Sequence, residues 1–114
     1  MSKKIVLIID NDSRVRSQII ECLGNTCEVI EADDGVKGLR YATKNSPDII
    51  FVDWKAPFVT GETFCNFLPK SLNFKNSKVV FMSAWPDNVA MDFKNTHSFI
   101  KKPLLREDIQ RAVA

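Results

Sequence analysis

The chain has 114 residues, of which 45% are hydrophobic and 26% are charged, and this size and composition suit one globular domain with one core, residues 1–114. Sixteen basic residues against 14 acidic residues give a net charge of +2 with no block of either sign, which argues against a dedicated nucleic-acid binder. Apolar runs such as residues 5–9 are far too short for the roughly 20 residues that cross a bilayer. Because the N-terminus also lacks a signal-peptide pattern, we expect a cytoplasmic protein.

Cysteine and histidine usage narrows the chemistry further. The three cysteines, Cys22, Cys27 and Cys65, form no CxxC pair, and His97 is the single histidine. We therefore expect reduced, mostly buried thiols instead of disulfides or a zinc site. One histidine also excludes any mechanism that needs two imidazoles.

Five short apolar stretches predict five β-strands. They cover residues 4–9, 28–31, 48–52, 78–82 and 98–100. The first, third and fourth are continuously apolar instead of alternating, a pattern typical of parallel strands that helices cover on both faces.

The segments between these strands have helical periodicity. Predicted helices cover residues 15–23, 36–44, 64–68, 87–95 and 105–113. Ser13 is expected to cap the first helix, Gly24-Asn25 to end it, and Asp34-Gly35 to open the second. The connection after Pro86 is tight, so the helix there is expected to be short or irregular.

Strands that alternate with helices predict an α/β fold with a doubly wound five-stranded parallel sheet. In such sheets, ligands bind outside the carboxyl ends of the strands, near the point where the strand order reverses. The residues that follow each predicted strand are therefore the first candidates for a functional site.

Polar side chains follow four of the predicted strands directly. These residues are Asp10-Asn11-Asp12, Asp53, Ser83 and Lys101-Lys102-Pro103. Taken singly, each has an ordinary interpretation as a helix cap, a turn residue or a solvated surface charge. Together, carboxylates, a hydroxyl and an ammonium are the groups that hold Mg²⁺ and a phosphoryl group.

These positions resemble the receiver domains of two-component response regulators, including the single-domain receivers of the chemotaxis type. The resemblance spans nearly the whole chain and rests on a small set of motifs. They are Ile8-Ile9-Asp10-Asn11-Asp12, Ala32-Asp33-Asp34-Gly35, Asp53-Trp54-Lys55-Ala56-Pro57 with Gly61, Met82-Ser83-Ala84 and Phe99-Ile100-Lys101-Lys102-Pro103. The resemblance implies a flavodoxin-like fold with strand order 2-1-3-4-5.

The resemblance also implies a role for individual residues. Asp53 would accept a phosphoryl group, Lys102 would neutralise charge, and Ser83 would donate a hydrogen bond to the phosphoryl oxygens. Magnesium would be bound by Asp10, Asn11, Asp53 and the main-chain carbonyl of Lys55. Ser83 and Phe99 would form the switch that transmits phosphorylation to a partner-binding surface.

One position departs from the family pattern. Receivers usually carry a second acidic residue where this chain has Asn11, which can coordinate a metal but brings no charge. We therefore expect weaker binding of Mg²⁺. Asp12 is the alternative source of charge, unless it serves as a helix cap.

The implied partners are a sensor histidine kinase or phosphotransfer protein and a downstream protein target, with neither nucleic acid nor membrane. The chain stops just after the last predicted helix, so output is expected through protein contact. On this interpretation the chain is a phosphoacceptor and not an enzyme in the usual sense.

Three alternatives stay open on sequence alone. A degenerate receiver would bind a partner without phosphorylation, and Asn11 supports this interpretation. A haloacid-dehalogenase-like phosphatase would use Asp10 in its Asp-x-Asp loop, but would leave the Asp53 motif unexplained. A flavin-binding domain is less favoured because no phosphate-binding loop rich in Ser, Thr or Gly follows the first strand.

Overall fold

A computed structural model of the chain describes residues 3–56, 58–60, 63–64, 66, 77–84 and 98–114. Its elements are β1 (Lys4–Ile9), α1 (Ser13–Leu23), β2 (Cys27–Ala32), α2 (Gly35–Asn45), β3 (Ile49–Asp53), β4 (Lys78–Ser83), β5 (Ser98–Lys101) and α5 (Arg106–Val113). All five predicted strands are present, and so are the first, second and last predicted helices. The helix predicted at 64–68 lies mainly outside the described residues, and the one predicted at 87–95 lies wholly outside them.

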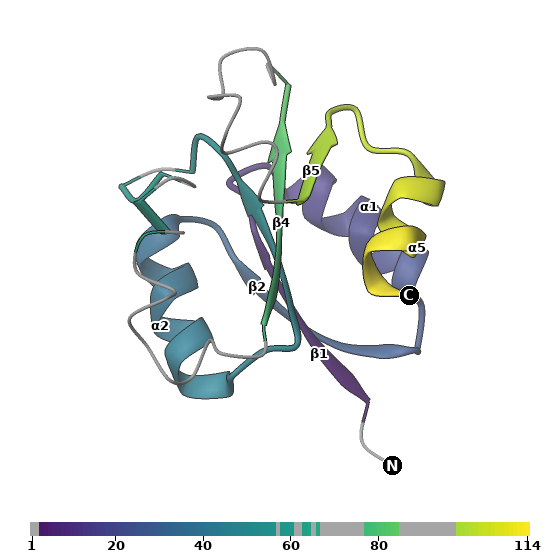
Figure 1. The fold of residues 1–114 in the computed structure, drawn as a ribbon, viewed down its shortest axis with the longest axis horizontal. Helices are drawn as coiled ribbons and strands as arrows, with labels where there is room; N and C mark the ends of the chain where they lie inside the picture. Colours follow the sequence, from purple (N-terminus) through teal and green to yellow (C-terminus); the bar gives the residue numbers. More distant parts are fainter. Residues whose placement is uncertain (1–2, 57, 61–62, 65, 67–76, 85–97) are drawn as a thin grey trace.

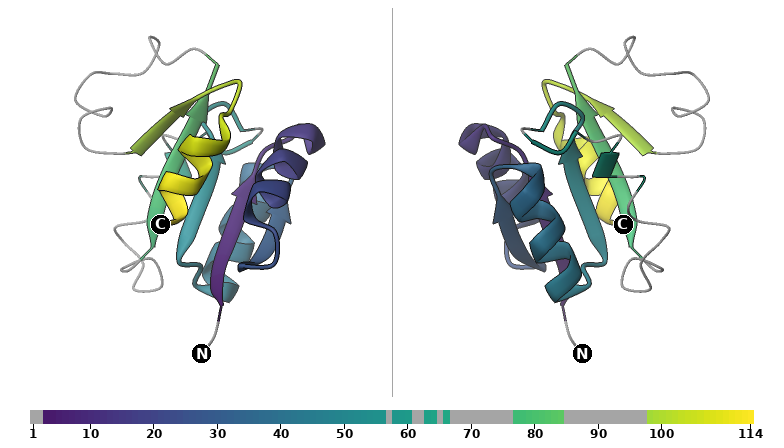
Figure 2. Two further views of the ribbon diagram at one scale, coloured as in Figure 1. Left: turned by 90° about the vertical axis from the view of Figure 1, so that its right-hand side faces the viewer. Right: turned by 90° about the vertical axis from the view of Figure 1, so that its left-hand side faces the viewer.

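The five strands form one parallel sheet in the order β2-β1-β3-β4-β5 (Figure 1). This order confirms the flavodoxin-like topology that the resemblance implied. Helices α1 and α5 lie against one face of the sheet and α2 against the other (Figure 2). The doubly wound arrangement explains the continuous apolar runs, because both faces of the central strands are covered.

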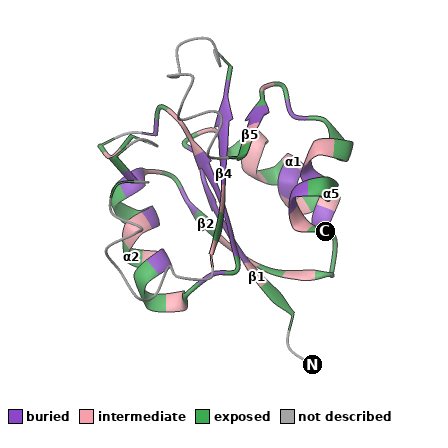
Figure 3. Ribbon diagram, in the orientation of Figure 1, coloured by how far each residue is buried: buried purple, intermediate pink, exposed green. Residues whose placement is uncertain are grey.

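Each face of the sheet has its own core, and β1 contributes to both. Val6 and Ile8 pack on the side of α1 and α5, whereas Leu7 and Ile9 pack on the side of α2. This alternation follows from the two-residue period of a strand. The last four residues of β1 and of β4 and the first four of β3 are buried, as the purple segments of Figure 3 show.

The helix ends correct one prediction and confirm two. Asp12, and not Ser13, is the N-cap of α1: its backbone is extended and its carboxylate accepts the Arg14 N–H at 2.9 Å. Both residue types can cap a helix, and here the cap lies one residue earlier than predicted, so that the helix begins at Ser13. Gly24 ends α1 with a φ of 57°, and Asp34 caps α2 by accepting the Lys37 N–H at 2.8 Å.

Cys22 and Cys27 are free thiols and are half-buried. Cys65 lies outside the described residues. The helices formed by the described part of the chain include none with the length and apolar character of a membrane span.

Candidate functional site

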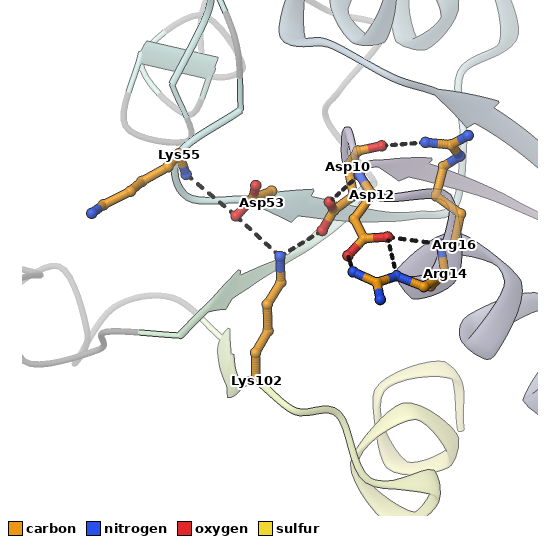
Figure 4. A network of polar contacts seen from close by, with 7 residues as sticks. All are labelled: Asp10, Asp12, Arg14, Arg16, Asp53, Lys55 and Lys102. Atoms are coloured by element: carbon orange, nitrogen blue, oxygen red, sulfur yellow. Dashed lines mark hydrogen bonds and ion pairs between the residues drawn. The ribbon is translucent and has the colours of Figure 1, made fainter.

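Three charged side chains from three strand ends meet at the carboxyl edge of the sheet (Figure 4). Asp10 follows β1, Asp53 is the last residue of β3, and Lys102 follows β5. The Lys102 Nζ lies 2.7 Å from Oδ2 of Asp10 and 3.4 Å from Oδ1 of Asp53. One ammonium thus pairs with two carboxylates that are 43 positions apart in the chain.

Main-chain pairing at the strand ends holds these side chains in place. The Asp10 N–H donates to the Ala32 carbonyl at 3.0 Å, and the Lys102 N–H donates to the Ser83 carbonyl at 2.9 Å. Both bonds extend the pairing of the sheet one residue past a strand. A cis peptide bond joins Lys102 to Pro103.

Burial dominates the electrostatics of the site. Asp10 is fully buried, and 13% of the Asp53 side chain is exposed. Burial raises the pKa of Asp53 above its ordinary value, and the charge of Asp10 raises it further, while Lys102 opposes both. Burial alone would lower the pKa of Lys102, but its hydrogen bond to Asp10 and the charge of Asp53 leave that pKa raised.

Asp12 is turned away from this group (Figure 4). Its two carboxylate oxygens face the Arg14 guanidinium, at 3.2 Å from Nε and 3.2 Å from Nη2. The side-chain hydrogen bond with Arg14, together with the one from the Arg14 backbone, lowers the pKa of Asp12. Asp12 therefore acts as a helix cap and does not supply a third carboxylate to the pair of Asp10 and Asp53.

The side chains around Lys102 offer carboxylate oxygens, which Mg²⁺ prefers as ligands, but among those described only two are acidic, Asp10 and Asp53. Asp10 and Asp53 already share a cation, the Lys102 ammonium, so both carboxylates face a common cationic position. Asn11 is exposed beside them. Within the described ranges, no three acidic, His or Cys side chains come together as a metal cluster. Asp10 and Asp53 are thus the two carboxylates at this edge of the sheet that could hold a divalent cation.

Lys55 follows Asp53 by two residues and contacts it through its backbone. The Lys55 N–H donates to Oδ1 of Asp53 at 3.4 Å, while its side chain is exposed and extends away from the pair of carboxylates (Figure 4). The side chain therefore does not supply the positive charge of the site, which comes from Lys102.

Ser83 lies on β4, the strand that pairs with the strand of Asp53, and Phe99 lies on β5, one strand further along the sheet. Ser83 is buried at the end of β4, and Phe99 is half-buried on β5. The Phe99 ring stacks on Phe81 with ring centroids 5.2 Å apart and lies 5.5 Å from Trp54. Trp54, the residue after Asp53, also meets Phe81 edge to face at 5.4 Å. An aromatic cluster thus joins the neighbour of Asp53 to the candidate switch residue.

Two residues that the sequence did not single out also belong to the site. Arg16 donates from Nη1 to the main-chain carbonyl of Asp10 at 2.6 Å and from Nε to Glu31 at 3.0 Å. The available signal was an arginine one turn into the helix that follows Asp10, with an acidic residue late in the neighbouring strand. Such a pair could equally have been a solvated surface pair, so sequence alone gave little reason to select it.

Comparison with known proteins identifies the family. The family model described as the response regulator receiver domain matches residues 6–114. The chain therefore belongs to the response regulator receiver domain family. Receiver domains act in two-component signalling, pair with histidine kinases, typically bind Mg²⁺, and are phosphoacceptors rather than classical enzymes. The dehalogenase-like and flavin-binding interpretations are wrong.

Individual relatives agree with this family. The protein PilG of Pseudomonas aeruginosa is 27% identical over 112 residues, covering 95% of this chain and 83% of PilG. The sensor histidine kinase TmoS of Ectopseudomonas mendocina is 25% identical over 112 residues, and the match covers 96% of this chain but 12% of TmoS. The chain thus corresponds to a small part of some relatives.

The fold also has close structural counterparts. The chemotaxis response regulator CheY4 of Vibrio cholerae superposes with a TM-score of 0.84 at 21% identity, covering 98% of this chain and 97% of CheY4. A putative response regulator from Chloroflexus aurantiacus gives a TM-score of 0.83 at 23% identity, with 98% and 95% covered. At these identities the similarity establishes the fold.

Proposed function

We propose that this chain is a phosphoacceptor receiver in which Asp53 takes a phosphoryl group from a histidine kinase or a phosphotransfer protein. The observation that supports the proposal most directly is the contact of Lys102 with both Asp53 and the fully buried Asp10. A lysine in this place brings positive charge to the carboxylate that must approach an anionic phosphoryl group.

The transfer is a displacement at phosphorus. An oxygen of the Asp53 carboxylate forms the new P–O bond, while the bond from phosphorus to the donor breaks and its electron pair leaves with the donor. The Lys102 ammonium lies within ion-pair distance of Asp53 and attracts the phosphoryl oxygens. Ser83, at the end of the adjacent strand, donates a hydrogen bond to the acyl phosphate once it has formed.

A magnesium ion would be bound by Asp10, Asp53, Asn11 and the carbonyl oxygen of Lys55. When bound, it supplies positive charge that lowers the cost of bringing a phosphoryl group to a carboxylate. Because Asn11 is neutral, this ion would be held less tightly than at a site with three carboxylates. Lys102 then carries a larger share of charge neutralisation.

The output is a change in a protein-binding surface. Phosphorylation draws the Ser83 hydroxyl toward the phosphoryl group, and Phe99, which packs on Trp54 and Phe81, responds as the second part of the switch. The partners are a cytoplasmic phosphodonor protein and a downstream protein target, and neither nucleic acid nor membrane takes part.

Intact-mass measurement after incubation with acetyl phosphate and Mg²⁺ tests this proposal. We expect a gain of one phosphoryl group in the wild type, located at Asp53 by peptide mapping, and no gain in Asp53→Asn. Asp33→Asn, which removes an exposed carboxylate elsewhere on the surface, serves as the matched control and should be modified like the wild type.

The degenerate-receiver alternative predicts a different result. If the wild type gains no mass under conditions that modify Asn11→Asp, the loss of the acidic residue at this position has inactivated the site, and the chain binds its partner without phosphorylation. Modification at any residue other than Asp53 would contradict the proposal as well.

A further inference from the structure

The Arg16 side chain connects α1 to the residue that follows β1. Its guanidinium is held between two acceptors, the main-chain carbonyl of Asp10 at 2.6 Å from Nη1 and the Glu31 carboxylate at 3.0 Å from Nε. Although charged, the Arg16 side chain is 17% exposed, whereas that of Glu31 is 46% exposed. The planar fork of an arginine is well suited to fix two acceptors at once.

Asp10 is fixed by donors from three places. Arg16 contacts its carbonyl oxygen, the Asp12 N–H donates to Oδ1 at 2.9 Å, and Lys102 donates to Oδ2 at 2.7 Å. In Figure 4 the carbonyl points toward Arg16, on the side away from Asp53. Because a peptide group is planar, holding this carbonyl also fixes the orientation of the Asn11 N–H.

We infer that Arg16 is a positioning residue, which holds the Asp10–Asn11 peptide so that the Asp10 carboxylate faces Asp53 and Lys102. Glu31 accepts a hydrogen bond from the Arg16 guanidinium and so fixes its orientation. This inference rests on the proposed function, because the consequence of the positioning is cation binding at Asp10 and Asp53. Arg16 contacts the main-chain carbonyl of Asp10, and neither the Asp10 nor the Asp53 carboxylate. Its effect on the site is therefore exerted through the Asp10 main chain.

The sign of the effect separates positioning from simple charge. A positive guanidinium close to the site repels Mg²⁺, so its removal strengthens Mg²⁺ binding if charge alone matters. Removal of a positioning contact instead allows the Asp10 peptide to rotate and weakens binding. Changes in groups that orient metal ligands typically cost about 10-fold to 100-fold in affinity.

The experiment is a Mg²⁺ titration followed by Trp54 fluorescence in a Trp85→Phe background. We expect Arg16→Gln to weaken Mg²⁺ binding at least about tenfold. Arg16→Lys, which keeps the charge but loses the fork, should fall between Arg16→Gln and the parent. Arg14→Gln is the matched control, because Arg14 pairs with Asp12 at the exposed surface, and it should bind as tightly as the parent or more tightly. Equal or tighter binding by Arg16→Gln would overturn the inference.

A second readout does not depend on the metal. The Asp12 N–H donates to the carboxylate that Arg16 is inferred to hold, so its hydrogen exchange in metal-free buffer should accelerate about tenfold in Arg16→Gln, beyond any change in global unfolding. Glu31→Gln should accelerate it less, because the Arg16–Asp10 contact remains. If the parent protein binds no Mg²⁺, the metal site of the proposed function is refuted. If the Asp12 N–H exchanges at the same rate in Arg16→Gln as in the parent, the positioning role of Arg16 is refuted separately.

Discussion

At the scale of single residues, Asp53 combines a largely buried side chain with a like charge nearby. The Asp10 carboxylate shares the Lys102 ammonium with it, and one ammonium does not fully offset burial and repulsion, so the pKa of Asp53 is raised. A carboxyl with a raised pKa binds its proton more tightly in the folded state than in the unfolded state. Ionised Asp53 therefore lowers the stability of the fold, a cost that fits a residue kept for chemistry and not for packing.

The expected consequence is that Asp53→Asn stabilises the protein at neutral pH. The contribution of Asp53 to stability is fully present below its ordinary pKa of 3.8 and is lost as the pH rises through the raised value. The gain on substitution should therefore be larger at pH 7 than at pH 3. Urea unfolding of both proteins in metal-free buffer at the two pH values measures it.

Asp33→Asn is an opposite-sign control for this measurement. The Asp33 pKa is lowered by its hydrogen bond to Lys37, so removing this charge should reduce stability more at pH 7 than at pH 3. A lower stability of Asp53→Asn at pH 7 would show that the Lys102 pair outweighs burial and repulsion.

At the scale of elements, the start of α2 packs tightly against the loop that follows Asp53. A Cβ built on Gly35 would lie 2.3 Å from the Val59 carbonyl oxygen, and that atom belongs to the backbone and not to a flexible side chain. The absence of a side chain at Gly35 is therefore what allows the helix and the loop to approach.

Gly35→Ala should destabilise the fold by about 2 kcal/mol, because the loop backbone must move to admit a methyl group. Val36→Ala is the neighbouring control: Val36 is 45% exposed, and its truncation should change the stability by less than about 0.5 kcal/mol. Thermal or urea unfolding of both variants measures the difference. Equal stabilities of Gly35→Ala and Val36→Ala would contradict this prediction, because they would mean that the loop after Asp53 moves to admit the methyl group with no loss of stability.

The elements also show how far sequence reasoning reached. Continuous apolar runs predicted β1, β3 and β4, because parallel strands buried on both faces need no polar alternation. The cap of α1 was misplaced by one residue, since Asp12 and Ser13 both have side chains that can cap, and local sequence does not separate them. Strand order came from the resemblance, because periodicity does not determine which strands are neighbours.

The site was predictable to the extent that its residues directly follow strands. Asp10, Asp53 and Lys102 each follow or end an apolar run, so the topology alone brings them to one edge. Arg16 was not predictable in this way: its contacts with the Asp10 carbonyl and with Glu31 depend on how α1 is placed relative to the end of β1 and to β2, which the periodicity of the sequence does not determine. The roles predicted for Ser83 and Phe99 remain predictions.

At the scale of the whole molecule, the fold places Asp53, which shares Lys102 with Asp10, next to an aromatic cluster. Trp54 follows Asp53 directly and touches Phe81 and Phe99, so its fluorescence should respond to what binds at Asp53. In a Trp85→Phe background, Trp54 is the sole tryptophan. Beryllofluoride, which mimics a phosphoryl group on a carboxylate, provides the ligand without turnover.

The most direct measurement is therefore the Trp54 fluorescence of the Trp85→Phe protein, titrated with Mg²⁺ and then with beryllofluoride. We expect a saturable response to beryllofluoride that requires Mg²⁺ and disappears in Asp53→Asn. Asn11→Asp should bind Mg²⁺ at least about tenfold more tightly, because a carboxylate replaces a neutral amide. A flat titration at saturating Mg²⁺, or an identical response from Asp53→Asn, would contradict a phosphoryl-accepting site at residue 53.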